Sequence, residues 1–172
     1  MSDIKEFQAE ARFLSNFISV RICYDGVVYP SVENAYQAAK CMSMDDRAQF
    51  KDCLAHEAKR LGKIVPMRSD WNKIKESVMY ELVKQKFTEH PTLREKLLAT
   101  GECHIEEGNR WGDTYWGVDI RTGEGDNRLG QMLMDIRSDL ETDLSIDIAT
   151  TYPQQHNLSD GSKAVLLQHY FS

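Results

Sequence analysis

Four side chains that can do chemistry recur at helical spacing in one short segment: Glu33, Tyr36, Gln37 and Lys40. Counted from the first, they stand at i+3, i+4 and i+7, so a helix places a carboxylate, a phenol, an amide and an amine on one face. Pro30 and Ser31 mark its start, because the residue before a proline avoids helical geometry and Ser is a favoured N-cap. The other face is mostly alanine, which favours close packing. The alternative without a function is a partly exposed helix with an intrahelical Glu–Lys relation. The spacing alone leaves both interpretations of the helix open.

A carboxylate and an amine on one helical face suit chemistry at the anomeric carbon of a sugar. Cleavage of an N-glycosidic bond builds positive charge at C1′, which a carboxylate stabilises, and the departing nitrogen needs a proton. An amine can instead attack the opened sugar aldehyde or its imine to form a Schiff base. Glu33 then shuttles protons and Lys40 is the nucleophile.

Such a nucleophile must lose its proton. A free lysine is protonated near neutral pH, so Lys40 must be desolvated or be deprotonated by Glu33. Glu33 lies in the first turn of the expected helix, where the helix dipole favours the carboxylate. We therefore expect Glu33 to remain ionised and to act as a base first.

The same segment belongs to a series of motifs spread along most of the chain. They are Phe13-Leu14-Ser15-Asn16-Phe17, the segment from Tyr29 to Lys40, Asp70-Trp71-Asn72, Val78-Met79, Lys86-Phe87, Asp113-Thr114-Tyr115-Trp116-Gly117, Asn127-Arg128-Leu129-Gly130, Leu133-Met134 and Ile136-Arg137. In this order they resemble the NADAR, or YbiA-like, family. The resemblance runs from about residue 4 to about residue 140 and implies an N-glycosidase that needs no cofactor and no metal.

The resemblance also implies roles for individual residues. The family's conserved Glu and Lys fall on Glu33 and Lys40, which supports both as catalytic. The residues expected to bind substrate are Asn16, Phe17, Tyr36, Gln37, Arg68, Trp71, Asp113, Trp116, Gly117, Asn127 and Arg128. Two of these stay open from sequence: Trp71 can stack on a base or start a core stripe, and Asp113 can bind ribose hydroxyls or close a turn.

Two substrate classes follow from the resemblance: ADP-ribose on guanine, in DNA or as a nucleotide, and phosphorylated ribosylamino-pyrimidine intermediates of riboflavin synthesis. We expect removal of ADP-ribose, because the chain carries no fused riboflavin enzyme. The expected partners are an ADP-ribose-type or ribosylamine phosphate small molecule, and ADP-ribosylated DNA through a local site. Two other classes of protein are a binding module for NAD or ADP-ribose without catalysis, which intact Glu33 and Lys40 argue against, and an interaction protein that uses the C-terminal tail.

The composition of the chain limits the kinds of partner that we expect. The chain has 172 residues and a net charge of −6, which argues against a broad basic surface that coats nucleic acid. Four cysteines show no ligand spacing, and no segment has the length and apolarity of a membrane span, so a cytoplasmic protein is expected. Glu102, His104 and Glu106 alternate, but three ligands on one strand rarely converge on a metal. Glu106 or Glu107 can instead belong to the wall of the site.

The periodicities predict an α+β, helix-rich single domain with a small antiparallel sheet over residues 1–141. Strands are expected at 18–24 and 27–29 around an Asp25-Gly26 turn, and at 102–107 and 115–120. Helices are expected at 31–40, from an N-cap at Ser43, at 55–61, from a cap at Ser69-Asp70 (the longest), from Pro91 to 98, and from 129 to 140. The glycine-rich run 123–130 leads into this last helix, whose start is a ready anion site, although the run is neither a dinucleotide-binding fingerprint nor a P-loop. Residues 142–172 are a C-terminal extension packed on the domain or appended to it, with a docked strand or short helix expected at 164–167.

Overall fold

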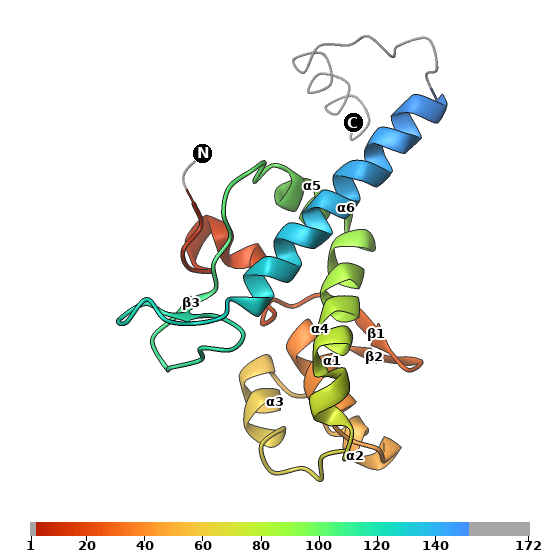
Figure 1. Cartoon of the computed structure of the whole chain (residues 1–172). Helices are drawn as coiled ribbons and strands as arrows, with labels where there is room; N and C mark the ends of the chain where they lie inside the picture. Colours follow the sequence, from red (N-terminus) through yellow and green to blue (C-terminus); the bar gives the residue numbers. More distant parts are fainter. Residues whose placement is uncertain (1–2, 152–172) are drawn as a thin grey trace. The chain divides into compact units, whose positions relative to one another are not determined.

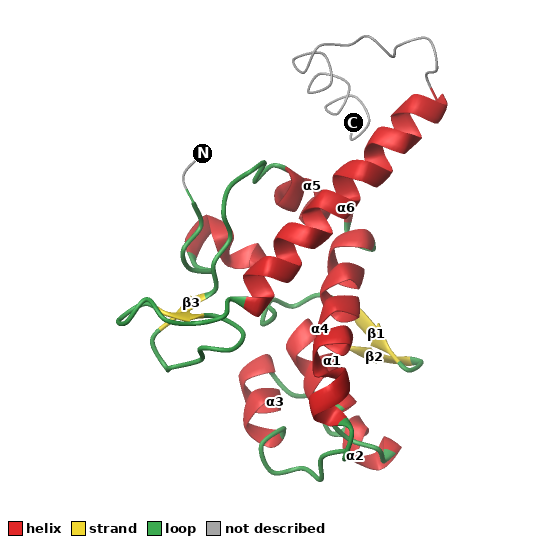
Figure 2. Cartoon of the chain, viewed as in Figure 1, coloured by secondary structure: helices red, strands yellow, loops and turns green. Residues whose placement is uncertain are grey.

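The computed structural model describes residues 3–151. The chain divides into two units, Met1–Arg137 and Ser138–Ser172. Within the described residues the ordered backbone is mostly helical, with two short pairs of strands (Figure 2). The α+β, helix-rich fold expected from the sequence is therefore confirmed. The strand or helix expected at 164–167 lies outside the described residues.

A β-hairpin stands close to the predicted position, after a short 3-10 helix over Ala9–Leu14. Strands β1 (Ile22–Tyr24) and β2 (Val27–Tyr29) pair antiparallel (Figure 1). Asp25 and Gly26 form the turn with φ of 50° and 76°, the left-handed geometry that Asp-Gly turns favour. The first strand is shorter than predicted, because the backbone at 15–18 forms a turn instead. The hairpin packs against α1 and α4.

Helix α1 (Val32–Ala39) carries the polar line seen in the sequence. Ser31 caps it as predicted, since its Oγ accepts a hydrogen bond from the Asn34 N–H at 3.1 Å. Every residue of α1 is buried, so the alternative of a partly exposed helix is wrong. The Asn34 side chain also donates to the carbonyls of Phe50 at 2.9 Å and Cys53 at 2.8 Å. These bonds fix the start of α1 to the loop before α3.

Two short helices follow, and the second approaches α1 closely. They are α2 (Met44–Ala48), capped by Ser43, and α3 (Ala55–Leu61), which ends at Gly62. Gly62 is right-handed with φ −62°, so space rather than backbone freedom requires glycine there. A Cβ at this position would lie 1.8 Å from Oε1 of Gln37. The absent side chain lets the end of α3 sit against the polar face of α1.

Helix α4 (Trp71–Thr88) covers α1 from another side, and α5 (Pro91–Leu98) follows with Pro91 in its first turn as predicted. Asp70 stands at the N-cap of α4 but makes no capping bond, so the predicted capping role is wrong. Arg68 holds the Asp70 carboxylate instead, with Nε 2.6 Å from Oδ1. The buried side chains of α4 are Trp71, Met79, Leu82, Val83, Lys86 and Phe87.

The strands expected at 102–107 and 115–120 are wrong in extent and pairing. Over residues 102–120 the structure has the two short strands β3 (Gly108–Asn109) and β4 (Val118–Asp119), and these pair in parallel. The connection between them is a hydrogen-bonded loop rather than a strand: the Asn109 side chain donates to the carbonyl of Asp113 and accepts from its N–H. Side-chain bonds of this kind hold the backbone in turns.

Helix α6 (Arg128–Thr151) is longer than predicted. It has 24 residues against 18 in α4, which the sequence had marked as the longest helix. Within the first unit Leu129, Leu133 and Ile136 of α6 are buried along the predicted stripe, and Asn127, just before the helix, is buried as well. The helix continues past residue 141, where the sequence placed the end of the main domain. Over residues 3–151, no helix combines the length and the apolar character that a membrane crossing requires.

Replacement of Asn34 by Ala tests the anchoring of α1. Asn34 is fully buried and its side chain serves two backbone carbonyls, so Asn34→Ala leaves both without a partner. We expect the free energy of unfolding to fall by about 2–4 kcal/mol, measured by urea denaturation. Gln49→Ala, at an exposed helix end, is the matched control and changes it by less than about 0.5 kcal/mol. Equal stabilities for the two variants would show that the Asn34 bonds do not anchor α1.

Candidate active site

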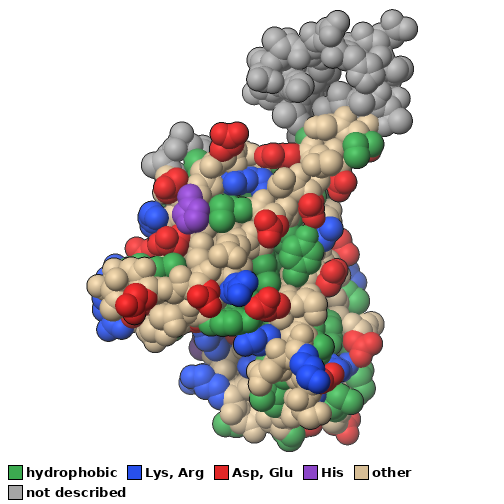
Figure 3. Space-filling view, in the orientation of Figure 1, with side chains coloured by type: hydrophobic (Ala, Val, Ile, Leu, Met, Phe, Trp, Pro, Cys, Tyr) green, Lys and Arg blue, Asp and Glu red, His purple; other side chains and the backbone are tan. Residues whose placement is uncertain are grey.

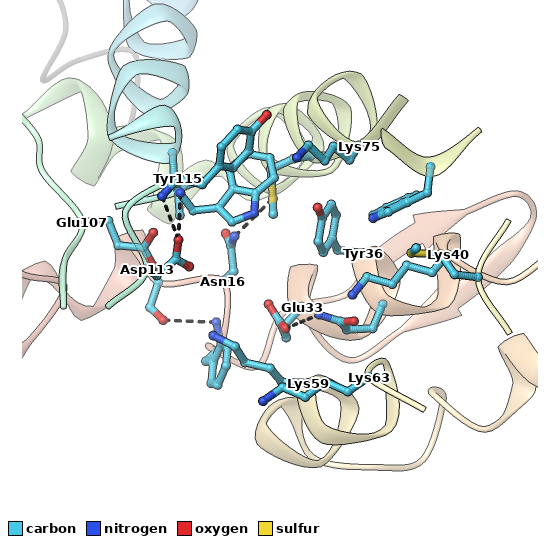
Figure 4. A pocket seen from close by; sticks show the side chains of 18 of the residues that line it. Asn16, Glu33, Tyr36, Lys40, Lys59, Lys63, Lys75, Glu107, Asp113 and Tyr115 are labelled. Carbon is cyan, nitrogen blue, oxygen red and sulfur yellow. Dashed lines mark hydrogen bonds between the residues drawn. The ribbon is translucent and has the colours of Figure 1, made fainter. Parts of the chain in front are cut away.

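A pocket of about 480 Å³ opens on the polar face of α1 (Figure 4). Its walls come from α1, α3 and the segment after it, α4, the loop at 15–17 and the loop at 107–116. It is lined by Ser15, Asn16, Phe17, Glu33, Tyr36, Gln37, Lys40, Lys59, Lys63, Met67, Trp71, Asn72, Lys75, Met79, Glu107, Asp113, Tyr115, Trp116 and Leu129. All four polar residues of the α1 line therefore face one pocket.

Glu33 is a carboxylate removed from water. Its residue is 6 % exposed, and Oε1 accepts a hydrogen bond from Nε2 of Gln37 at 2.8 Å. Burial raises the pKa of Glu33, and the Gln37 bond and the charges of Lys59 and Lys40 act in the opposite direction. The sequence argument weighed only the helix dipole. Burial dominates instead, so Glu33 takes up a proton more readily than a surface glutamate.

Lys40 ends α1 and turns its amine into the pocket (Figure 4). Its Nζ lies 3.5 Å from the carbonyl oxygen of Gly62, 5.8 Å from the Tyr36 ring centre and 6.0 Å from the Trp71 ring centre. Burial lowers the pKa of Lys40, and Glu33 is the largest opposing influence. Partial desolvation therefore favours the neutral amine that a nucleophile needs.

Three aromatic rings form one wall beside Lys40. The Tyr36 and Trp71 ring centres are 4.9 Å apart, and Trp116 meets Tyr36 edge-on at 5.8 Å. Tyr36 and Trp71 are each 5 % exposed. Burial raises the pKa of Tyr36, so its phenol stays neutral. Both functions weighed for Trp71 meet here, because the ring is buried in the protein and also lines the pocket.

Two acidic side chains from the loop at 107–116 face the pocket opposite the lysines. Asp113 closes a turn, since Oδ1 accepts from the N–H groups of Tyr115 at 3.2 Å and Trp116 at 2.9 Å, and it also lines the pocket. Glu107 belongs to the wall as well, whereas Glu106 turns to Lys5 at 3.2 Å. Burial, with the charges of Asp113 and Glu33, raises the pKa of Glu107 to about 8.

Three lysines that the sequence analysis missed complete the site: Lys59, Lys63 and Lys75. Lys59 lies 5.5 Å from the Phe17 ring centre, and Lys75 lies 3.8 Å from that of Tyr115. Lys59 lies on α3 and Lys63 in the turn just after it, so no helical spacing in the sequence joined the two. No sequence spacing linked Lys75 to the other two lysines, because only the tertiary fold brings α4 to the pocket.

The structure keeps four predicted binding residues out of the pocket lining: Arg68, Gly117, Asn127 and Arg128. The Arg68 guanidinium is bound to Asp70. Arg128 is half-exposed, with Nε 3.9 Å from Glu76. The other two support the 105–118 backbone: a Cβ on Gly117 would lie 2.1 Å from the Glu107 carbonyl oxygen, and the Asn127 side chain bonds to residues 105 and 107.

Some buried polar atoms at the pocket lack a partner within the described residues. They include Oδ1 of Asn16, Oε1 of Gln37 and Oε2 of Glu107. Because buried polar groups are nearly always hydrogen-bonded, such atoms in a pocket wall are candidates to bind a ligand. Over residues 3–151 no cluster of His, Cys, Asp or Glu is suited to a metal ion, and Glu106 and His104 face each other at 3.9 Å.

The loop that carries Asn16 and Phe17 is held from below by a buried lysine. Lys86 is fully buried, and its Nζ donates to the carbonyls of Leu14 at 3.2 Å and Ser15 at 2.9 Å. Burial lowers the pKa of Lys86 to about 7.

Comparison with known proteins shows which family the chain belongs to. The family model of the NADAR domain matches residues 4–141. The chain belongs to the NADAR family. It is 36 % identical over 129 residues to N-glycosidase YbiA of Escherichia coli K12, covering 73 % of this chain and 79 % of that protein. It is 36 % identical over 135 residues to Riboflavin biosynthesis protein VVA0006 of Vibrio vulnificus, covering 75 % of this chain and 35 % of that protein.

A solved structure is also similar. The NMR structure of the E. coli protein YbiA aligns with a TM-score of 0.70 and 31 % sequence identity, over 92 % of this chain and 94 % of that one. The fold described above is thus a YbiA-like fold.

The buried Lys86 predicts a pH dependence of stability. The unfolded chain holds the Lys86 proton up to a pH of about 10.4, whereas the folded chain releases it near 7. Between these values the unfolded state binds more protons, so folding stability rises with pH. Relative to Lys86→Met, the free energy of unfolding of the natural protein should increase by about 1 kcal/mol per pH unit from 7 to 10.

The comparison is made by denaturant unfolding at several pH values. Exposed Lys51→Met is the control, and its difference from the natural protein should stay constant with pH. A constant difference for Lys86→Met as well would mean that Lys86 stays charged in the folded protein.

Proposed function

We propose that this chain is an N-glycosidase that hydrolyses the bond between ribose C1′ and a nitrogen, with ADP-ribose on guanine as its preferred substrate. The reaction class rests on the family, since similar proteins are named N-glycosidases. The observation that carries the mechanism is the placement of Lys40 and Glu33 in one pocket, both partly or fully desolvated.

The reaction that fits this pair passes through a Schiff base. The Lys40 amine adds to C1′ of the opened sugar and gives up its proton to Glu33. The C1′–nitrogen bond then breaks, its electron pair leaves with the nitrogen, which takes the proton back from Glu33, and an imine joins C1′ to Nζ. Water adds to the imine carbon, and the protons return as Lys40 is released.

The charges of the pocket support a substrate with a diphosphate. Lys59, Lys63 and Lys75 line it together with Lys40. A diphosphate spreads its negative charge over a longer stretch than a monophosphate and engages more such lysines. The aromatic wall of Tyr36, Trp71 and Trp116 supplies faces for a base.

The charges on the protein surface limit how nucleic acid can bind. Basic and acidic side chains are mixed over the face of the molecule drawn in Figure 3, and the net charge is −6. ADP-ribosylated DNA would therefore bind through the pocket lysines rather than through a broad basic surface. We place this reaction in the cytoplasm, which the four free cysteines support.

A second candidate is the N-glycosidase reaction on ribosylamino-pyrimidine phosphates of riboflavin synthesis. The similar Vibrio protein named for riboflavin biosynthesis favours it, although the chain spans only 35 % of that protein. The two candidates share the C1′ chemistry and differ in what lies beyond the ribose.

A turnover assay with both substrates tests the function. The protein is incubated with ADP-ribosylated guanosine and, separately, with the phosphorylated ribosylamino-pyrimidine, and free base and free sugar are followed. We expect faster release from the first. Faster release from the second assigns the riboflavin reaction, and binding of either compound without release would make the chain a binding module.

Substitution of Lys40 tests its role as nucleophile. Lys40→Ala and Lys40→Arg should each lose at least about 10³-fold in kcat, because a guanidinium stays protonated and cannot attack the sugar carbon. The thermal midpoint should change little. Lys73→Arg on the exposed side of α4 is the matched control with full activity. An active Lys40→Arg protein would show that this position supplies only positive charge.

A further inference from the structure

Two carboxyl groups line the pocket, the buried Glu33 and the half-buried Glu107, and their surroundings differ. Glu33 on α1 accepts a hydrogen bond from Gln37 at 2.8 Å. Glu107, just before β3, has a buried Oε2 with no partner within the described residues. Figure 4 shows Glu107 beside Asp113 on one side of the pocket, with Glu33 between them and Lys40. The reaction proposed above uses only Glu33.

The charges and hydrogen bonds around the two carboxyl groups differ. Glu33 has two cations that favour its carboxylate, Lys59 and Lys40. Glu107 faces the like charges of Asp113 and Glu33, with Lys59 as the opposing cation. Burial is the largest influence on both groups, but only Glu33 also receives a hydrogen bond from a neighbouring side chain. Burial raises the pKa of Glu107 to about 8, so its carboxyl group carries a proton at neutral pH, and no side chain within the described residues binds its buried Oε2.

We propose that Glu107 is a second catalytic residue of this site, the acid that protonates the departing nitrogen while Glu33 serves as the base. This inference rests on the proposed N-glycosidase function. As the C1′–nitrogen bond breaks, its electron pair goes to the nitrogen, which takes the proton from the Glu107 carboxyl group. Glu33 accepts the proton released when Lys40 or water bonds to C1′. Exchange with solvent then returns a proton to Glu107 and removes one from Glu33, so the cycle balances.

The backbone around Glu107 is built to hold it in place. Its N–H donates to Oδ1 of Asn127 at 3.0 Å, and its carbonyl accepts from Val118 N–H at 3.0 Å. Nδ2 of Asn127 also donates to the Ile105 carbonyl at 2.9 Å. Gly117 leaves the space that the Glu107 carbonyl needs. Asn127 and Gly117, which the sequence marked as substrate-binding, thus act as positioning residues for Glu107.

The test compares Glu107→Gln with Glu106→Gln on the substrate that the natural protein turns over. Glu107→Gln keeps the shape but carries no acidic proton, so kcat at pH 7 should fall by about 10²–10⁴-fold. The neighbouring Glu106 turns away to Lys5, and Glu106→Gln should keep the natural rate. Thermal midpoints measured alongside show whether each variant is folded.

The pH profile separates proton donation from a structural role. In the natural protein kcat should fall as the pH rises past about 8, where Glu107 loses its proton. Glu107→Asp should be slower but keep this alkaline fall, and Glu107→Gln should lose it. A Glu107→Gln protein that keeps either the natural rate or the alkaline fall overturns the role of Glu107. If the natural protein cleaves neither substrate, the proposed function fails instead.

Discussion

The burial of Glu33 is the constraint on which the rest of the site depends. A carboxyl group that is 6 % exposed must be hydrogen-bonded or paired, or it takes up a proton. Gln37 supplies the hydrogen bond from the next turn of α1, and Lys59 and Lys40 supply positive charge. The same desolvation lowers the pKa of Lys40, so one buried helix face favours both a proton acceptor and a neutral amine.

The surrounding structure is arranged so that this helix can be buried. Ser31 and Asn34 satisfy polar groups at its start, and Gly62 lets α3 approach Gln37 without a clash. On the other side, Lys86 holds the backbone that leads to Asn16 and Phe17. Apart from the local Ser31 cap, these contacts join segments far apart in the sequence, and their combined effect is a pocket with defined walls around α1.

Features that depend on neighbouring residues could be predicted from the sequence, whereas features that depend on tertiary packing could not. The capping Ser31, the Asp25-Gly26 turn and Pro91 act within a few residues of themselves, so their predicted roles hold in the structure. The motif around Asn127 suggested a ligand, and local spacing did not reveal that its side chain bonds to the backbone at 105 and 107. Lys75 and the wall position of Glu107 depend on how distant segments pack, which no local spacing reveals.

The central claim is that Lys40 bonds covalently to the sugar. Borohydride added during turnover reduces an imine to a stable amine, and mass spectrometry of the digested protein locates it. The account predicts a sugar adduct on Lys40 in the natural protein and none in Lys40→Ala. Normal hydrolysis with no adduct on Lys40 would contradict it and would favour direct attack of water on C1′, with Glu33 as the base.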